Sequence, residues 1–133
     1  LLPRRNRMKL GHIDILLADL DAGLPFYATL LPLIGLTRVR DHVWANEDGV
    51  HLDFRQATQP GHAYQRAAPG LNHLGFTAPD RAALEAIRAA MAAAGFAVPE
   101  IQDYPDGSAI FFKDAEGMRV EVGTYDAAGS SRG

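Results

Sequence analysis

Histidines and carboxylates recur at matching positions in two separate stretches of the chain. His12 and His73 each lie seven residues before an aspartate, and a second match further along places Asp53 opposite Glu121. Imidazole nitrogens and carboxylate oxygens in such a set suit divalent Zn, Ni, Co, Mn or Fe(II). A lone strand histidine is more often a hydrogen-bonded structural residue, but its repetition favours a site. We therefore take these four side chains as the candidate site.

The matching stretches predict that the chain is an internal duplication. In each copy the histidine lies in a predicted strand, an aspartate suits the start of a helix, and a glycine, Gly35 or Gly95, suits its end. The second match aligns residues 47–54 with residues 115–122 without a gap. Both segments read as a tight turn followed by a short alternating strand. Each copy is therefore a predicted β-α-β-β-β unit, and the predicted fold class is α+β.

The duplication predicts how the chain is divided. We expect one domain over residues 8–126, with unit one at 9–56, a linker at 57–70 and unit two at 71–125. The predicted strands lie at 9–17, 37–42, 43–46, 50–56, from 71 onward, 96–102, 108–113 and 118–124. The predicted helices lie at 20–33 and 81–94, and a turn is expected at 104–107. Residues 1–7 are expected to lie outside the domain, as a disordered segment or as residues added ahead of Met8.

Alternation along the predicted strands separates the side chains that face the helices from those that do not. Val120 and Val122 should pack under a helix, which places Glu121 on the opposite face. The same reasoning places there the other candidates, which are His12, Asp14, His51, Asp53, Arg55, His73 and Arg119. Four of these are candidates for a substrate pocket: Asp14, His51, Arg55 and Arg119. An internal ion pair would explain the charged members equally well, and His51 is also a rival of Asp53 as a metal ligand.

The composition limits the expected partners and compartment. With 133 residues, 47% of them hydrophobic, the chain is expected to form one domain with a substantial core. The net charge of −3 argues against nucleic acid or an anionic membrane surface as the main partner. The absence of cysteine excludes disulfides and thiolate metal ligands. No apolar run reaches transmembrane length, and residues 1–7 do not resemble a signal peptide, so a cytoplasmic location is expected.

The predicted duplication and three short motifs resemble the vicinal oxygen chelate superfamily. The motifs are PFY at 25–27, NHLGF at 72–76 and FKDAEG at 112–117, and the resemblance covers residues 8–125. That superfamily holds glyoxalase I, extradiol dioxygenases and bleomycin-resistance proteins, and the chain looks like a glyoxalase-like member with a single module. The resemblance implies that each unit forms half of a curved, cup-like mixed sheet, with the helices outside and a divalent metal inside.

The same resemblance implies a ligand set and a chemistry. It maps the metal ligands of the superfamily onto His12, Asp53, His73 and Glu121. The ligand in the fourth strand is usually Glu or Gln, so the shorter Asp53 is a departure from the pattern. A metal with open positions can chelate a substrate that carries two adjacent oxygens and stabilise an enediolate as a Lewis acid. The superfamily pattern gives the proton-transfer role to Glu121 or Asp53.

The function implied by the resemblance is a metal-dependent lyase or isomerase acting on a small substrate with vicinal oxygens. A metal-free, ligand-sequestering protein of the bleomycin-resistance type and a small extradiol-type dioxygenase are the alternatives. The His and Glu set favours an enzyme, because a sequestering protein does not need it. Single-module members often form two-fold dimers. We therefore expect a homodimer in which each site takes His12 and Asp53 from one chain, and His73 and Glu121 from the other.

Overall fold

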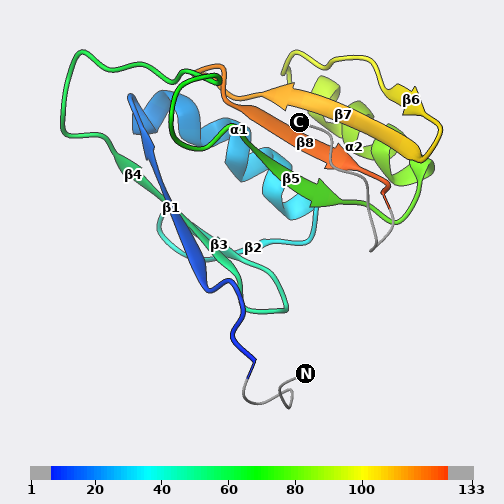
Figure 1. Cartoon of the computed structure of the whole chain (residues 1–133), viewed down its shortest axis with the longest axis horizontal. Helices are drawn as coiled ribbons and strands as arrows, with labels where there is room; N and C mark the ends of the chain where they lie inside the picture. Colours follow the sequence, from blue (N-terminus) through cyan, green and yellow to red (C-terminus); the bar gives the residue numbers. More distant parts are fainter. Residues whose placement is uncertain (1–6, 126–133) are drawn as a thin grey trace.

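The chain folds into two similar units, each a four-stranded sheet with one helix (Figure 1). This computed structural model describes residues 7–125, so the expectations for residues 1–6 and 126 lie outside the described residues. Unit one contains β1 (His12–Leu17), α1 (Leu20–Leu33), β2 (Thr37–Arg40), β3 (Val43–Ala45) and β4 (His51–Gln56). Unit two contains β5 (His73–Thr77), α2 (Arg81–Ala93), β6 (Gln102–Tyr104), β7 (Gly107–Lys113) and β8 (Arg119–Gly123). The predicted α+β fold with two tandem β-α-β-β-β units is confirmed.

Both sheets have the same topology. The strand order is β1-β4-β3-β2 in the first sheet and β5-β8-β7-β6 in the second. In each, the first strand lies at an edge and pairs in parallel with the last strand of its unit, while the other pairs are antiparallel. The parallel registers place Asp14 opposite Asp53 and Gly75 opposite Glu121. The candidate side chains of each unit therefore come from two adjacent strands.

The aspartates and glycines that were predicted to begin and end the two helices do so. Asp19 accepts a hydrogen bond of 3.1 Å from the Ala22 N–H at the start of α1, and Asp80 accepts one of 2.8 Å from Ala83 at the start of α2. The glycines that follow the helices, Gly35 and Gly95, have φ angles of 92° and 93°, a region that favours glycine. Because each helix begins directly after a histidine-bearing strand, these caps fix where β1 and β5 end. Within residues 7–125, neither helix is long and apolar enough to cross a membrane.

One hydrophobic core joins the two units. From α1, Tyr27 contacts Phe54 of β4 with a ring-centroid distance of 4.3 Å, and Phe26 contacts Phe112 of β7 at 6.4 Å. The Tyr27 hydroxyl also donates a buried hydrogen bond of 2.6 Å to Oδ2 of Asp114, directly after β7. Burial and the adjacent Asp114 carboxylate raise the pKa of Tyr27. Helix α1 therefore contacts the cores of both units, and the sheet faces that carry the candidates lie on the other side.

The strand expected at 96–102 is wrong, whereas the turn expected at 104–107 is confirmed, because residues 105 and 106 form a turn between the paired residues Tyr104 and Gly107. No strand occurs within 94–101, and β6 covers only Gln102–Tyr104, paired with the start of β7. The Phe96 N–H still bonds to the Met91 carbonyl at the end of α2. Pro99 has no N–H to contribute to a strand ladder. The apolar residues that suggested a strand pack against the core from a loop instead.

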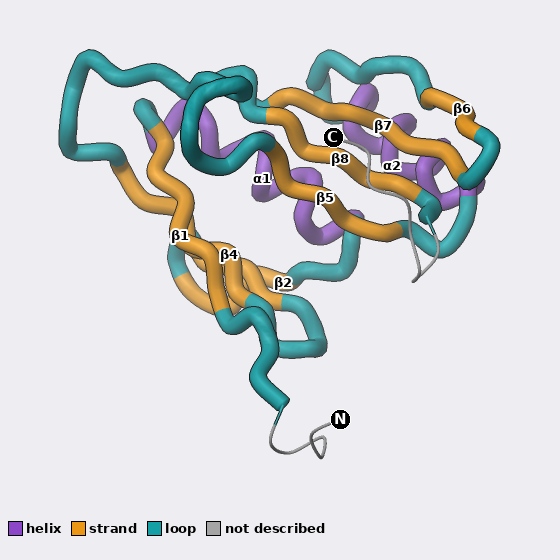
Figure 2. The backbone as a smooth tube through the Cα atoms, viewed as in Figure 1, coloured by secondary structure: helices purple, strands orange, loops and turns teal. Residues whose placement is uncertain are grey.

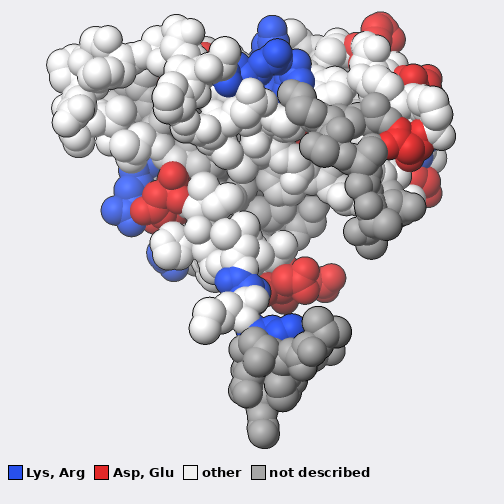
Figure 3. Space-filling view, in the orientation of Figure 1, with Lys and Arg blue, Asp and Glu red and all other residues white. Residues whose placement is uncertain are grey.

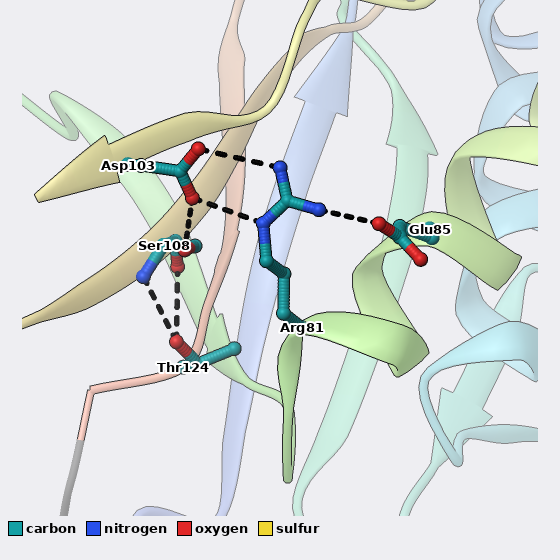
Figure 4. A network of polar contacts seen from close by, with 5 residues as sticks. All are labelled: Arg81, Glu85, Asp103, Ser108 and Thr124. Carbon is teal, nitrogen blue, oxygen red and sulfur yellow. Dashed lines mark hydrogen bonds and ion pairs between the residues drawn. The ribbon is translucent and has the colours of Figure 1, made fainter.

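A polar network fixes the short strand β6 against its neighbours (Figure 4). Arg81 at the start of α2 donates to Asp103 Oδ1 at 3.0 Å and also contacts Glu85. The Ser108 hydroxyl donates to the same Asp103 oxygen at 2.6 Å, and the Ser108 N–H donates to the Thr124 hydroxyl at 2.9 Å. The hydrogen bond from Arg81 holds the pKa of the Asp103 carboxyl below its usual value. These contacts hold α2, β6, β7 and the residue after β8 together.

Candidate functional site

The first sheet presents five candidate side chains on the face turned away from α1. They are His12 and Asp14 of β1 and His51, Asp53 and Arg55 of β4. The intervening residues of both strands, such as Ile15 and Phe54, are buried in the core, as alternation predicts. The five side chains line an open hollow of about 420 Å³. Unit one therefore offers two imidazoles and two carboxylates at one polar surface.

Arg55 compensates the negative charge of this first half-site. Its guanidinium lies 2.9 Å from Asp53 Oδ2 and 3.8 Å from Asp14 Oδ2. The hydrogen bond to Asp53 and the charges of both carboxylates raise the pKa of Arg55. Both hydrogen bonds from Arg55 go to Oδ2, so Oδ1 of Asp53 has no hydrogen bond or ion pair within the described residues. In Figure 3, basic and acidic atoms lie side by side over the region of β1.

A hydrogen bond identifies which ring nitrogen of His51, in the same hollow, carries a hydrogen. Its Nδ1 lies 2.8 Å from the Gly49 carbonyl oxygen. A carbonyl can only accept, so Nδ1 carries the proton and the Nε2 of a neutral ring keeps its lone pair. Asp53 and His51 thus each leave one electron-pair donor available. The geometry alone does not choose between them as ligands.

The second sheet brings His73 of β5 and Glu121 of β8 together. Nε2 of His73 lies 3.2 Å from Oε1 of Glu121, and Glu121 is only 4% exposed. The contact does not have hydrogen-bond geometry, and Oε1 has no hydrogen-bond partner within the described residues. Burial, followed by the hydrogen bond and charge of Glu121, raises the pKa of Tyr125, so the phenol stays protonated beside the carboxylate. A buried carboxylate with an unsatisfied oxygen therefore faces an imidazole.

Asn72 determines which nitrogen of His73 faces Glu121. The Asn72 side-chain nitrogen donates to the Arg66 carbonyl at 2.8 Å, which identifies its other terminal atom as the oxygen. That oxygen lies 2.6 Å from His73 Nδ1, so Nδ1 must be the donor. In the neutral imidazole, Nε2 then directs a lone pair toward the Glu121 oxygen. Two facing electron-pair donors repel one another unless a proton or a metal ion lies between them.

This donor pair fits a metal ion. Metal–nitrogen and metal–oxygen bonds of about 2.0–2.2 Å at tetrahedral Zn place adjacent ligand atoms about 3.3 Å apart. The 3.2 Å separation between His73 and Glu121 is close to that value. Asn72 supplies the hydrogen bond to the far ring nitrogen that metal-binding histidines normally have. The second half-site therefore has suitable donor atoms and a suitable spacing.

The four predicted metal ligands do not meet within one chain. His12 and Asp53 lie on the first sheet, and His73 and Glu121 lie on the second, which is a separate set of paired strands. Among the described residues, no three His, Asp or Glu side chains are close enough to hold a metal ion together. The structure therefore contains two half-sites. Both edge strands, β1 and β5, begin with a histidine, and no strand of residues 7–125 pairs with their outer sides.

A larger hollow, which none of the candidates lines, is bordered by residues 56–64. These residues belong to the end of β4 and to the long loop that connects β4 to β5 (Figure 2). The hollow has a volume of about 790 Å³ and includes Gln56, Tyr64 and Glu116 in its lining. The side chains of these three residues already form hydrogen bonds within the chain. Gln56 and Glu116 bond to the backbone between β1 and α1, and the Tyr64 hydroxyl donates to the Asn72 carbonyl. Neither Glu121 nor Arg119, which carry buried atoms without a hydrogen-bond partner among the described residues, lines this hollow.

Two residues of the second half-site were missed by the sequence reasoning. Asn72 was part of a quoted motif, but nothing in its residue type indicated that it orients His73. Tyr125 has the same alternation parity as Glu121, and its ring lies against Gly123, where any larger residue would collide with it. The glycine two residues before a tyrosine was therefore a usable signal. Tyr125 lies just beyond the last strand, which is why alternation along the strand did not include it.

The comparison with known families agrees with this fold. The family described as the Glyoxalase/Bleomycin resistance protein/Dioxygenase superfamily matches residues 9–122. The chain belongs to this superfamily. An uncharacterised Bacillus subtilis protein, YqjT, is 28% identical over 123 residues, which cover 84% of this chain and 94% of that protein. The superfamily assignment made from the sequence motifs is therefore confirmed.

Solved structures of the superfamily share the fold. A glyoxylase/bleomycin resistance protein/dioxygenase domain from Frankia matches with a TM-score of 0.73 and 22% identity, covering 92% of this chain and 95% of that one. A lactoylglutathione lyase from Agrobacterium tumefaciens matches with a TM-score of 0.62 and 19% identity, covering 90% and 95%. At these identities the similarity establishes the fold and leaves the reaction to be argued from the site.

Proposed function

We propose that this superfamily member is a divalent-metal-dependent lyase or isomerase acting on a small substrate with two adjacent oxygens. The observation that carries the proposal is the buried Glu121 carboxylate, which faces His73 at 3.2 Å without a hydrogen bond at Oε1. A buried carboxylate without a compensating partner carries a large desolvation penalty. A divalent cation between the two side chains would remove that penalty and the repulsion between their lone pairs.

We propose His12, Asp53, His73 and Glu121 as the ligands, for Zn, Ni, Co, Mn or Fe(II). Asp53 would bind through Oδ1 while Arg55 holds Oδ2. A metal bound there would polarise a substrate carbonyl as a Lewis acid. We assign to Glu121 the role of accepting and returning a substrate proton, which is supported by its burial, since burial limits access of competing water. Asp53 is the second candidate for that role.

A homodimer would complete the site. Each chain supplies one half-site on β1 and β4, which lines an open hollow, and another on β5 and β8, where Glu121 is buried. A two-fold dimer that joins the first half-site of one chain to the second half-site of its partner would form two equivalent centres. It would also cover the outer edges of β1 and β5, which are otherwise free for unwanted pairing. The small-molecule substrate and the cytoplasmic location remain predictions.

The alternative is a metal-free protein that sequesters a ligand in the same cup. It is favoured by one observation: Arg55 already compensates Asp53 and Asp14 without a metal. In that case the first half-site would be a ligand-binding surface rather than half of a metal centre. A small dioxygenase would use the same metal ligands as the lyase, and it would differ in consuming O2 and in requiring a redox-active metal such as Fe(II).

Elemental analysis of purified protein, incubated with each of the five metals and then desalted, tests the proposal. We expect about one divalent ion per chain and a higher thermal unfolding temperature when metal is bound. Glu121→Gln should lose the ion, whereas Arg38→Gln should keep it because Arg38 pairs with Asp41 on an exposed strand. No uptake of any of the five metals, with an unchanged unfolding temperature, would reject the metal-dependent function and favour sequestration.

A further inference from the structure

Two cations lie side by side on the site face of the second sheet. Lys113 of β7 is directly opposite Arg119 of β8, and Arg119 is directly opposite His73 of β5. Residues opposite one another in a sheet share a face, so these three side chains form one row. The next row along the same strands holds Gly75, Glu121 and Phe111. The cations therefore lie beside the proposed metal ligands.

These cations lack compensation within the described residues. Neither Lys113 nor Arg119 forms an ion pair with any described residue. In contrast, Arg81 and Arg88 on α2 of the same unit are each paired with a carboxylate. Like charges directly opposite one another in a sheet are destabilising. Figure 3 shows basic atoms gathered where β7 ends and β8 begins. A chain with a net charge of −3 therefore maintains a local positive cluster at its site.

Arg119 is also held in place, but one of its N–H groups lacks a hydrogen-bond acceptor within residues 7–125. Its guanidinium carbon lies 4.7 Å from the centroid of the Phe111 ring, a cation–π contact. Its Nε is shielded from solvent and has no hydrogen-bond partner among the described residues. A shielded N–H without an acceptor costs free energy, which an anionic acceptor would recover. The ring fixes the direction in which the guanidinium presents its donors.

We propose that Lys113 and Arg119 form a subsite for a carboxylate group of the substrate, next to the His73–Glu121 pair. Space for the rest of that molecule lies over the second row, because a side chain added at Gly75 would meet no heavy atom within 4 Å. Phe111 provides an apolar wall in the same row. The substrate class is thus a small carboxylic acid with a planar or apolar body. This inference rests on the proposed function, because it uses the same cup.

Benzoate and its neutral analogue benzamide are suitable probes, because they differ in the group that the subsite would recognise. Binding is measured by calorimetry on metal-depleted protein, so that chelation by a metal cannot contribute. We expect the wild type to prefer benzoate by roughly tenfold or more, the gain from one charge-assisted hydrogen bond. The preference should fall in Arg119→Gln and in Lys113→Gln. Lys113 is exposed, so its variant tests the subsite even if Arg119→Gln folds poorly.

Arg38→Gln is the matched control, because it removes one positive charge that is paired with Asp41 and lies on β2 of the first sheet, and it should keep the wild-type preference. Metal content is measured on the same variants after reloading and is expected to stay unchanged in Lys113→Gln. Failure of the subsite would appear as equal binding of the two probes, no binding of benzoate by the wild type, or a preference that survives in Lys113→Gln and Arg119→Gln. Failure of the proposed function would appear as absent metal uptake whatever the probes do.

Discussion

A mixing experiment tests whether each site is shared between two chains. His12→Ala damages the first half-site, and Glu121→Ala damages the second. Each variant alone should hold little metal, because every site in its homodimer lacks one ligand. In a mixed dimer, one site would carry both lesions and the other would carry none, because each site takes one half from each chain. Unfolding the two variants together and refolding them should therefore restore metal binding.

The size of the recovery follows from symmetry. Random reassortment of equal amounts gives about half mixed dimers, and each of those has one intact site of two, so about one quarter of all sites should bind metal. The assay is elemental analysis after desalting, with native mass spectrometry to show that mixed dimers have formed. Zero recovery in a mixture that contains mixed dimers would refute the shared site, though not metal binding itself.

The chain also offers a control in which mixing should fail. His12 and Asp53 lie on the same sheet, on strands that pair directly. In a mixed dimer of His12→Ala and Asp53→Ala, every shared site would contain one damaged first half-site. This mixture should therefore give no more metal than the average of its two parents. Recovery here would show that refolding itself, rather than complementation, restores metal binding.

Two further substitutions test individual contacts. Asp53→Ala should weaken metal binding more than His51→Ala, measured by competition with a chromogenic chelator, because the repeat aligns Asp53 with Glu121; the opposite order would assign the fourth ligand position to His51. Tyr27→Phe should lower the free energy of unfolding by about 1–3 kcal/mol in urea titrations, because Asp114 Oδ2 loses its buried donor. Tyr64→Phe, which removes an exposed hydroxyl contact, should cost less, and an equal loss in both variants would contradict the importance of burial.

The elements that sequence reasoning located correctly are those specified by local chemistry. Helix α1 was predicted at the observed residues, because its start depends on Asp19 and its end on Gly35, both within one turn of the helix. Alternation alone predicted which side chains of each strand face the helices, since that face of each sheet is buried. Strand β6 was misplaced because the same apolar residues can be buried from a loop, and only Pro99 indicated that they were not in a ladder.

The contacts that the sequence did not reveal are those between distant residues. Tyr27 and Asp114 are separated by 87 positions, and no periodicity connects them. Likewise, the repeat assigned two candidate ligands to each unit, but the separation of the two half-sites in space depends on how the units pack. Arg55 was placed on the correct face by alternation, whereas its choice of Asp53 Oδ2 over a solvent-exposed position depends on side-chain geometry.

The duplication has kept equivalent positions while giving them opposite electrostatic surroundings. In the first half-site, Asp53 has a guanidinium partner at 2.9 Å, and the neighbouring Asp14 is close to the same cation. In the second, Glu121 is buried, and His73 is the only side chain within ion-pair distance of it among the described residues, while Arg119 contacts the Phe111 ring. An added cation would therefore stabilise the structure most at Glu121, whose buried Oε1 lacks a hydrogen-bond partner in the described part of the chain. An added anion would do so at Arg119, whose buried Nε likewise lacks one there. Because these two lie two residues apart on one strand, a metal and a carboxylate-bearing substrate would supply both charges at adjacent positions of the same cup.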